Sequence, residues 1–179
     1  MCAPGTTQPT PEAFKCKQGG YCATASVFKH CPAGTHGNRS GGTGRLDACA
    51  VCPPTFYCPE GSPLPIGPCP TGHYCPAGTK FAKQWACPGG TYSDATNLVR
   101  VTTCKACPQG YYCPPGSVAG TNRPCPAGYF CPASTSAYDE HPCPIGTYSG
   151  QVERLIDASQ CTVRAPAAYS SPANPSLLI

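Results

Sequence analysis

The sequence has few of the side chains that build a hydrophobic core. Leu, Ile, Val and Phe account for 22 of its 179 residues, and there is one Met and one Trp. That share of about 12% lies well under the ~20% that a folded chain usually needs. Ordering each residue costs about 1–2 kcal/mol of backbone entropy. Because so few apolar side chains cannot offset this cost, covalent cross-links must hold the fold together.

Charge and long apolar runs are also scarce. Charged residues make up 11% of the chain, and the net charge of +4 forms no basic cluster, which argues against nucleic acid as a partner. No apolar run approaches the length of a membrane span. No apolar signal sequence follows Met1, so we expect a fragment cut from a longer chain. No catalytic constellation or phosphate loop stands out, and we therefore expect neither an enzyme nor a bound cofactor.

Cysteine, proline and glycine are abundant instead, with 17, 24 and 20 residues. Cysteine at this density indicates an oxidising compartment, so we expect an extracellular or cell-surface location. Pro and Gly recur too often for long helices. We expect a small disulfide-rich fold with short β-hairpins, little regular secondary structure and one short helix over Val152–Ala158.

One pattern, C-P-x-G-x-Tyr-C-P-x-G-[ST], recurs along the chain, and such internal repetition decides the fold class. Each occurrence is called a repeat here, and its first cysteine is the anchor. Gly stands three residues after the anchor, except at Thr55, and we expect φ > 0 there in a turn. An aromatic residue stands five after the anchor, except at His36, and we expect it to cover the adjacent disulfide. The anchors are Cys16, Cys31, Cys52, Cys69, Cys87, Cys107, Cys125 and Cys143.

Three consecutive repeats form a longer unit with six cysteines. In each third repeat the cysteine after the aromatic residue is missing, and a later cysteine closes the repeat. These later cysteines are Cys49, Cys104 and Cys161. The predicted segments are a partial unit at 1–51, complete units at 52–106 and 107–163, and a Pro/Ala/Ser-rich extended tail at 164–179. We expect the units to touch only through short joints and to grow along one axis as an elongated array.

The third repeats contain two cysteines each, which predicts the bridges Cys31–Cys49, Cys87–Cys104 and Cys143–Cys161. Carrying this separation into the other repeats predicts a crossed scheme that leaves Cys16 without a partner. Its pairs are Cys52–Cys69, Cys58–Cys75, Cys107–Cys125, Cys113–Cys131 and Cys2–Cys22. The alternative scheme pairs neighbours six residues apart, such as Cys52–Cys58. On the chain-entropy model, a bridge closing a loop of about 17 residues contributes about 3 kcal/mol.

The segment CPGGTYSDATNLVRVTTCKACPQGYYC, Cys87 to Cys113, resembles the ephrin-receptor-like cysteine-rich repeat. That family's pattern is C-P-x-G-T-[YF], then a loop and C-x-x-C-P-x-G, akin to the modules of growth-factor and tumour-necrosis-factor receptors. The resemblance covers about residues 16–163 and implies no catalytic residues. The additional cysteine after Tyr departs from the simplest receptor form and is similar to tandem arrays in surface and extracellular-matrix proteins of protists.

We therefore expect a structural extracellular protein, either a spacer or a subunit of a cell-surface filament, coat or matrix. Such a protein associates with its own copies or with other extracellular proteins. The tail ends in Leu177, Leu178 and Ile179, and we expect it to dock on a neighbouring copy. The sequon at Asn38 predicts N-glycosylation.

The alternative function is the ectodomain of a receptor or adhesin that binds a protein or glycan. Its candidate contact patch is Phe81–Ala86, which contains the one tryptophan, Trp85. Local packing of this aromatic residue over the neighbouring disulfides is the competing interpretation.

Metal and redox sites are less well supported by the sequence. The pairs Cys49/Cys52 and Cys104/Cys107 are spaced as C-x-x-C, but no second pair lies at zinc-finger spacing, and we expect disulfides. Asp139-Glu140 lacks the further oxygen ligands that calcium needs. The four histidines, scattered over the chain, are His30, His36, His73 and His141.

Overall fold

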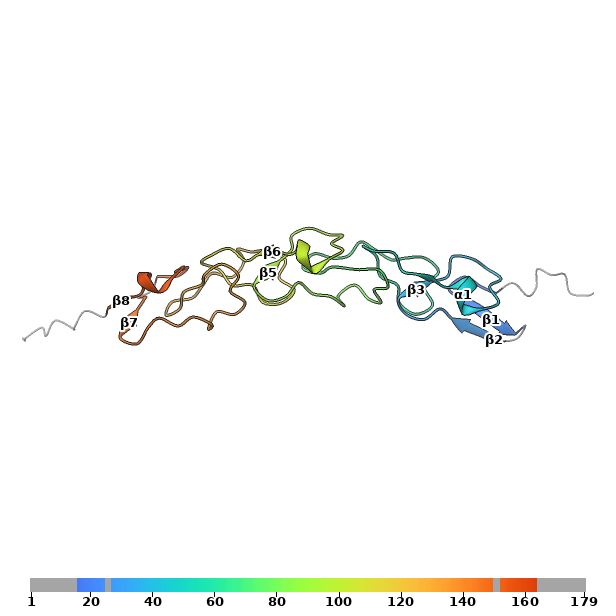
Figure 1. Cartoon of the computed structure of the whole chain (residues 1–179), viewed down its shortest axis with the longest axis horizontal. Helices are drawn as coiled ribbons and strands as arrows, with labels where there is room; N and C mark the ends of the chain where they lie inside the picture. Colours follow the sequence, from blue (N-terminus) through green and yellow to red (C-terminus); the bar gives the residue numbers. More distant parts are fainter. Residues whose placement is uncertain (1–15, 25–26, 150–151, 164–179) are drawn as a thin grey trace, which may run out of the picture.

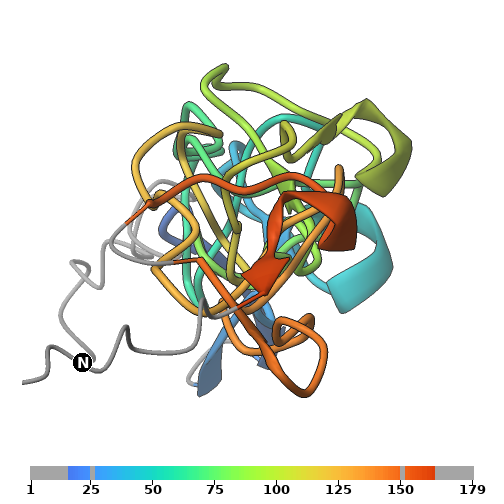
Figure 2. The same cartoon turned by 90° about the vertical axis from the view of Figure 1, so that its left-hand side faces the viewer.

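The computed structural model describes residues 16–24, 27–149 and 152–163. They form an elongated rod, with the first and last repeats at its two ends (Figure 1). Seen along its long axis, the repeats overlap around a common centre (Figure 2). The predicted fold class, a small disulfide-rich array with short hairpins and little regular secondary structure, is confirmed.

Regular secondary structure consists of short antiparallel strand pairs and single helical turns. The strands are β1 (Gly20–Thr24) with β2 (Val27–His30), β3 (Thr35–His36) with β4 (Ala50–Val51), β5 (Thr91–Tyr92) with β6 (Lys105–Ala106), and β7 (Thr147–Tyr148) with β8 (Thr162–Val163). The helical turns are α1 (Arg45–Ala48), η2 (Val101–Thr103) and η3 (Ala158–Gln160). Each third repeat thus contains one two-residue strand pair and one helical turn.

The predicted helix over Val152–Ala158 is wrong. Arg154 adopts a φ of 64°, which lies in the left-handed region and cannot belong to a right-handed helix. The helical turn in this part of the chain, η3, begins at Ala158 instead.

Cystine sulfur fills the centre of the rod. The cysteines with no exposed surface are Cys31, Cys52, Cys58, Cys69, Cys75, Cys87, Cys107, Cys113, Cys125 and Cys131. The aromatic residues five after the anchor lie farther out: Tyr74 and Tyr112 are half-buried, and Tyr148 is exposed. The disulfides themselves therefore occupy the axis, and the rings lie outside them.

The cysteines pair in two ways. The third repeats contain the predicted bridges Cys31–Cys49, Cys87–Cys104 and Cys143–Cys161. Every other repeat pairs its anchor with the cysteine six residues later, and we call these short-bridged repeats. Their bridges are Cys16–Cys22, Cys52–Cys58, Cys69–Cys75, Cys107–Cys113 and Cys125–Cys131.

The crossed scheme is consequently wrong. It paired Cys52–Cys69, Cys58–Cys75, Cys107–Cys125, Cys113–Cys131 and Cys2–Cys22, but each described member of these pairs is bonded within its own repeat. Cys16, expected to lack a partner, is bonded to Cys22. Cys2 and the tail at 164–179 lie outside the described residues.

A tight turn explains the short bridges. In the Cys69 repeat the amide of His73 donates to the carbonyl of Pro70 over 3.3 Å, and Gly72 has a φ of 73°. A positive φ at the third position is typical of a type II turn. The turn reverses the chain and leaves the Cα atoms of Cys69 and Cys75 5.9 Å apart, which is within disulfide range. The other short-bridged repeats have Cα–Cα distances of 5.8–5.9 Å. The predicted positive φ three residues after the anchor is confirmed, and Thr55 shares it at 73°.

A second turn explains the Ser or Thr at the end of the pattern. In the Cys69 repeat, Thr79 is 1% exposed, and both its amide and its Oγ1 donate to the carbonyl of Pro76, over 3.3 and 2.6 Å. The buried hydroxyl therefore has an internal partner, as buried polar groups require. The same side-chain bond recurs at Ser62, Ser117 and Thr135.

Four hydrogen bonds join each repeat to the next. The anchor amide donates to the carbonyl three residues after the preceding anchor. Three further groups of each repeat bond to the following repeat. They are the anchor carbonyl and the amides three and six residues after the anchor. At the junction between the Cys52 and Cys69 repeats these bonds are Cys69 N–H to Thr55 C=O, Thr55 N–H to Cys75 C=O, Gly78 N–H to Cys52 C=O, and Cys58 N–H to Thr79 C=O.

This ladder continues through the predicted unit boundaries. Cys52 N–H donates to the carbonyl of Gly34, and Cys107 N–H to that of Gly90, both over 2.9 Å. The expectation that units touch only at short joints is therefore wrong. The ladder does not distinguish third repeats from the others. The three-repeat period appears instead in the long bridges and in the strand pair and helical turn of each third repeat.

The pairing can be checked on the unreduced protein. Cleavage after Arg45, Glu60 and Lys80 releases peptides 46–60 and 61–80. Because Cys69 is bonded to Cys75, we expect peptide 61–80 to leave the digest linked to nothing else, with an internal bridge visible by mass spectrometry. A disulfide between the two peptides would restore the crossed scheme.

The buried turn hydroxyl can be tested by replacing it with a methyl group. Thr79→Val keeps the shape but removes the donor, and we expect a loss of about 1–2 kcal/mol in the free energy of unfolding. Thr91→Val is the matched control, because Thr91 makes the same bond to Pro88 over 2.6 Å but is only half-buried. We expect the control to change stability by less than ~0.5 kcal/mol, measured by denaturant unfolding without reductant. Equal effects in both variants would contradict this explanation.

Candidate interaction surface

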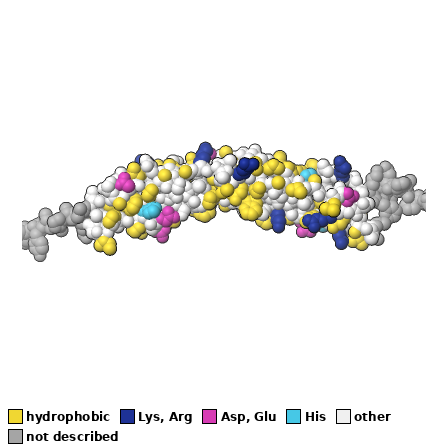
Figure 3. Space-filling view, viewed as in Figure 1, with side chains coloured by type: hydrophobic (Ala, Val, Ile, Leu, Met, Phe, Trp, Pro, Cys, Tyr) yellow, Lys and Arg dark blue, Asp and Glu magenta, His cyan; other side chains and the backbone are white. Residues whose placement is uncertain are grey.

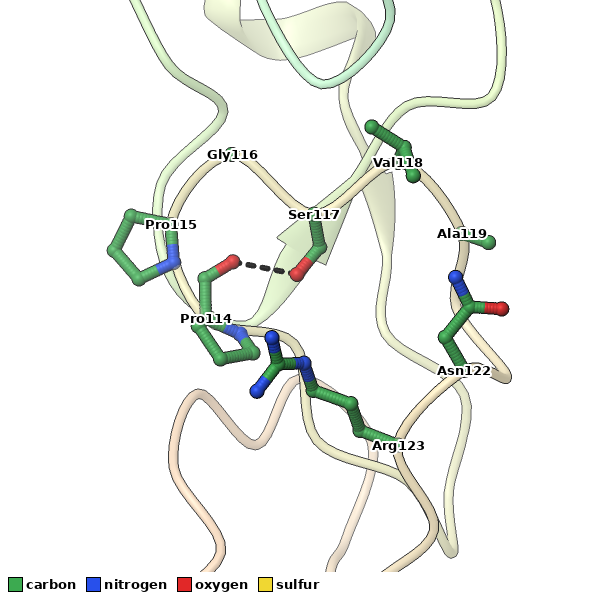
Figure 4. A pocket seen from close by; sticks show the side chains of 8 residues that line it. All are labelled: Pro114, Pro115, Gly116, Ser117, Val118, Ala119, Asn122 and Arg123. Carbon is green, nitrogen blue, oxygen red and sulfur yellow. Dashed lines mark hydrogen bonds between the residues drawn. The ribbon is translucent and has the colours of Figure 1, made fainter.

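The hollows on the rod are small. One, of about 190 Å³, lies beside the end of the Cys107 repeat and is lined by Pro114, Pro115, Ser117, Val118 and Arg123 (Figure 4). Two others, of about 220 and 210 Å³, lie in the first and last repeats. Pockets for small organic ligands usually reach ~300–1,000 Å³ and bury most of the ligand. None of these three hollows reaches that size, so none of them is a candidate site for a small organic ligand.

The predicted contact patch is partly exposed. Phe81 and Trp85 are 56% and 42% exposed. Trp85 stacks on Tyr74 with ring centroids 6.2 Å apart, and the Tyr74 amide donates to the carbonyl of Trp85. One face of the indole therefore packs on its own repeat, while much of the aromatic surface remains available to a partner.

Aromatic side chains also brace neighbouring repeats. Tyr138 packs edge-on against Tyr112 and Tyr129, with centroids 5.9 and 5.7 Å apart. Arg154 donates to the hydroxyl of Tyr111 over 2.8 Å and lies 5.6 Å from its ring centroid. Tyr129 belongs to the same repeat as Tyr138, but the Tyr112–Tyr138 and Tyr111–Arg154 contacts each join two different repeats on the outside of the rod.

The carboxylates with shifted pKa values stabilise loops. Amides of Thr43 and Gly44 donate to Asp47 over 3.1 and 2.7 Å, and these bonds lower the pKa of Asp47. Lys105 donates to Asp94 over 2.7 Å, which lowers the pKa of that carboxyl. Each of these carboxylates is satisfied within its own loop, so neither is a candidate for binding chemistry.

The loop with Asp139-Glu140, for which the sequence predicts no calcium site, contains another carboxylate with a lowered pKa. The Ser136 hydroxyl donates to Glu140 and lowers the pKa of its carboxyl, with the Ser136 amide adding a second bond over 3.2 Å. His141 stacks on Phe130 at 5.3 Å, and its Nε2 lies 3.9 Å from Glu140. His36 is half-buried, and its Nδ1 has no partner among the described residues. In the same part of the chain, no three His, Cys, Asp or Glu side chains lie close enough to hold a metal ion.

The two C-x-x-C pairs are split between different disulfides. Cys49 is bonded to Cys31 while Cys52 is bonded to Cys58. In the same way, Cys104 is bonded to Cys87 while Cys107 is bonded to Cys113. Neither pair is therefore a dithiol, and all of these sulfurs are engaged in bridges.

The glycosylation sequon lies in an exposed loop. Asn38, Arg39 and Ser40 are all exposed, and Gln18 donates to the main-chain carbonyl of Asn38 over 3.1 Å. The Asn38 side chain makes no hydrogen bond to any described residue, so an enzyme that attaches a glycan has access to it.

Comparison with models of known families gives no match, and comparison with curated proteins gives none either. Over residues 16–24, 27–149 and 152–163, no helix has the length and apolar character to span a bilayer.

Replacing Trp85 tests whether its role is packing or contact. Because the indole is 42% exposed, we expect Trp85→Ala to lower the free energy of unfolding by less than ~1.5 kcal/mol, about the value of one aromatic pair. Trp85→Phe is the control that retains a ring on Tyr74. A loss of ~3 kcal/mol or more, as for a buried tryptophan, would show that the residue belongs to the core.

Proposed function

We propose that this chain is a structural repeat protein of the extracellular space or cell surface. It serves as a stiff spacer or as a subunit of a filament, coat or matrix. The observation that carries the proposal is the ladder of main-chain hydrogen bonds that joins all eight repeats without interruption. The ladder keeps neighbouring repeats at a fixed spacing along the rod. Such a protein is suited to spanning a distance.

Two independent links at each anchor support stiffness. The anchor sulfur is fixed by a bridge inside its repeat, and the anchor amide and carbonyl bond the repeats on either side. Bending at one junction requires the loss of several hydrogen bonds, at about 0.5–1.5 kcal/mol each. Solenoid proteins whose repeats contact only their neighbours grow along one axis in the same way.

The bridges and the sequon support the location. All sixteen cysteines among the described residues are in disulfides, which persist in oxidising compartments and are rare in the cytosol. The exposed Asn38 is proposed to carry an N-glycan. The repeats are proposed to be of the ephrin-receptor-like type found in arrays of surface and matrix proteins. The proposal gives the chain no catalytic step and no cofactor.

The exposed aromatic patch favours one second candidate, a receptor or adhesin ectodomain that binds a protein or glycan. Phe81 and Trp85 form an exposed pair at mid-rod. Since Trp85 is the one tryptophan in the chain, tryptophan emission, excited selectively over that of tyrosine, reports on this patch. A change in this emission on adding one member of a glycan panel would identify such a ligand.

The spacer function predicts that length scales with repeat number. A variant with a second copy of residues 52–106 inserted after residue 106 is expected to be longer by one unit, with an unchanged cross-section, in small-angle X-ray scattering. The native rod is expected to exceed the radius of gyration of about 16 Å for a compact globule of this length. A duplicated chain that becomes more compact, or bends between the copies, would contradict the proposal.

The location is tested separately on cells that produce the chain. Antibodies against it are expected to label intact, unpermeabilised cells or the surrounding matrix. Labelling that appears only after permeabilisation would place the chain inside the cell and would overturn the extracellular role.

A further inference from the structure

The last repeat exposes an unfinished end of the ladder. In the seven preceding repeats, the anchor carbonyl and the amide six residues after it bond to the following repeat. In the Cys143 repeat, the corresponding groups are the Cys143 carbonyl and the Ser149 amide. The ladder also uses the amide three residues after the anchor, which is that of Gly146 in this repeat. None of the three has a hydrogen-bond partner among the described residues. This end therefore presents the same groups that bind a further repeat elsewhere in the rod.

Two glycines mark where further repeats belong. A Cβ on Gly72 or Gly90 would lie 2.4 or 2.2 Å from a carbonyl oxygen of the repeat two positions farther along. Gly128 and Gly146 have the same positive φ, 89° and 85°, but a Cβ on either would meet nothing within 4 Å. Among the described residues, none fills the space at this end that two more repeats would occupy.

The charges of the two ends are opposite. Residues 16–51 contain four basic and one acidic side chain, and residues 125–163 contain one basic and four acidic side chains. The basic residues of the first group are exposed, as are the acidic residues of the second. They are Lys17, Lys29, Arg39 and Arg45 at one end and Asp139, Glu140, Glu153 and Asp157 at the other. On the face in Figure 3, most basic side chains lie over the middle and the N-terminal part of the rod.

Exposed apolar side chains also lie at both ends. Val27 and Phe28, in strand β2 of the first repeat, are 46% and 39% exposed. Ile145 is fully exposed in the last repeat, and Val152 is 61% exposed. Side-chain contacts between two ends can therefore add apolar burial to the main-chain bonds.

We propose that the C-terminal end of the rod, formed by the Cys143 repeat, binds the N-terminal end of a second copy, formed by the Cys16 repeat and β1–β2. The second copy continues the ladder, so that the rods join head to tail. Such an interface joins two different surfaces and does not close on itself, which gives an open filament. This inference rests on the proposed role as a filament subunit and not on that of a solitary spacer.

The test begins with Gly146→Asn. Asparagine tolerates a positive φ better than most residues, and it points into open space in the single rod but into the second copy in the filament. Gly78→Asn is the matched control, because Gly78 has a φ of 80° and its nearest neighbour, Val51, lies 4.0 Å from the added Cβ. By sedimentation velocity of the full chain, we expect Gly146→Asn to weaken self-association at least tenfold and the control to leave it unchanged. Non-reducing peptide mapping verifies that both variants retain the native bridges.

A charge exchange tests the polarity of the interface. Four charged side chains make no hydrogen bond or ion pair with any described residue, and these are Asp139, Glu153, Lys17 and Lys29. We expect Asp139→Lys with Glu153→Lys, and separately Lys17→Glu with Lys29→Glu, to abolish association of each variant alone. Mixing the two variants restores complementary ends and is expected to restore association. Association of the native chain is expected to weaken as salt rises from about 0.05 to 0.5 M, because salt screens exposed charges.

The outcomes separate this inference from the proposed function. A native chain that remains monomeric overturns the end-to-end interface, while the length-scaling experiment still decides whether the rod is a spacer. Association that survives Gly146→Asn and both charge reversals also overturns it, and indicates lateral contacts or docking by the tail. Loss of association with Gly146→Asn, together with rescue in the mixture, supports the head-to-tail interface.

Discussion

The rod depends on a single residue type used in two ways at once. Each anchor cysteine contributes its sulfur to a bridge, and from Cys31 to Cys125 its amide and carbonyl bond the two neighbouring repeats. The side chain thus fixes the repeat, and the main chain fixes the array. Replacing an anchor would remove the bridge, leave its partner sulfur buried in the axis and free the backbone that holds both neighbours. The scarcity of Leu, Ile, Val and Phe follows, since the sulfurs occupy the space that such side chains fill in a globular protein.

This division leaves the outward-facing side chains free to differ between repeats. The ladder uses main-chain atoms, so it places few demands on the residues between the turns. The helical turns α1, η2 and η3 project from the repeated frame (Figure 2). Trp85 and Asn38 are likewise exposed. Binding or assembly functions can therefore be added to the outside of the rod without affecting the contacts that keep it straight.

The error in the predicted disulfides has a physical cause. The crossed scheme extended the separation of Cys87 and Cys104 to repeats that have a second cysteine six residues after the anchor. The Pro-x-Gly turn decides otherwise, since this local turn by itself brings Cys69 and Cys75 within bonding distance. The Gly three residues after the anchor predicts this turn. The crossed scheme is wrong because it ignores how close the turn brings the two cysteines that flank it.

The sequence by itself determined the repeats, the need for disulfides, the three long bridges and the positive φ of Gly72 and its equivalents, because each follows from local chemistry and spacing. It also located Asn38 in an exposed loop and Trp85 where the pattern departs from its neighbours. Only the tertiary structure decided how one repeat bonds the next, that the ladder crosses the boundary at Cys107, and that ladder groups of the Cys143 repeat have no partner among the described residues. Those features come from main-chain amides and carbonyls, which every residue carries and which no side-chain pattern records.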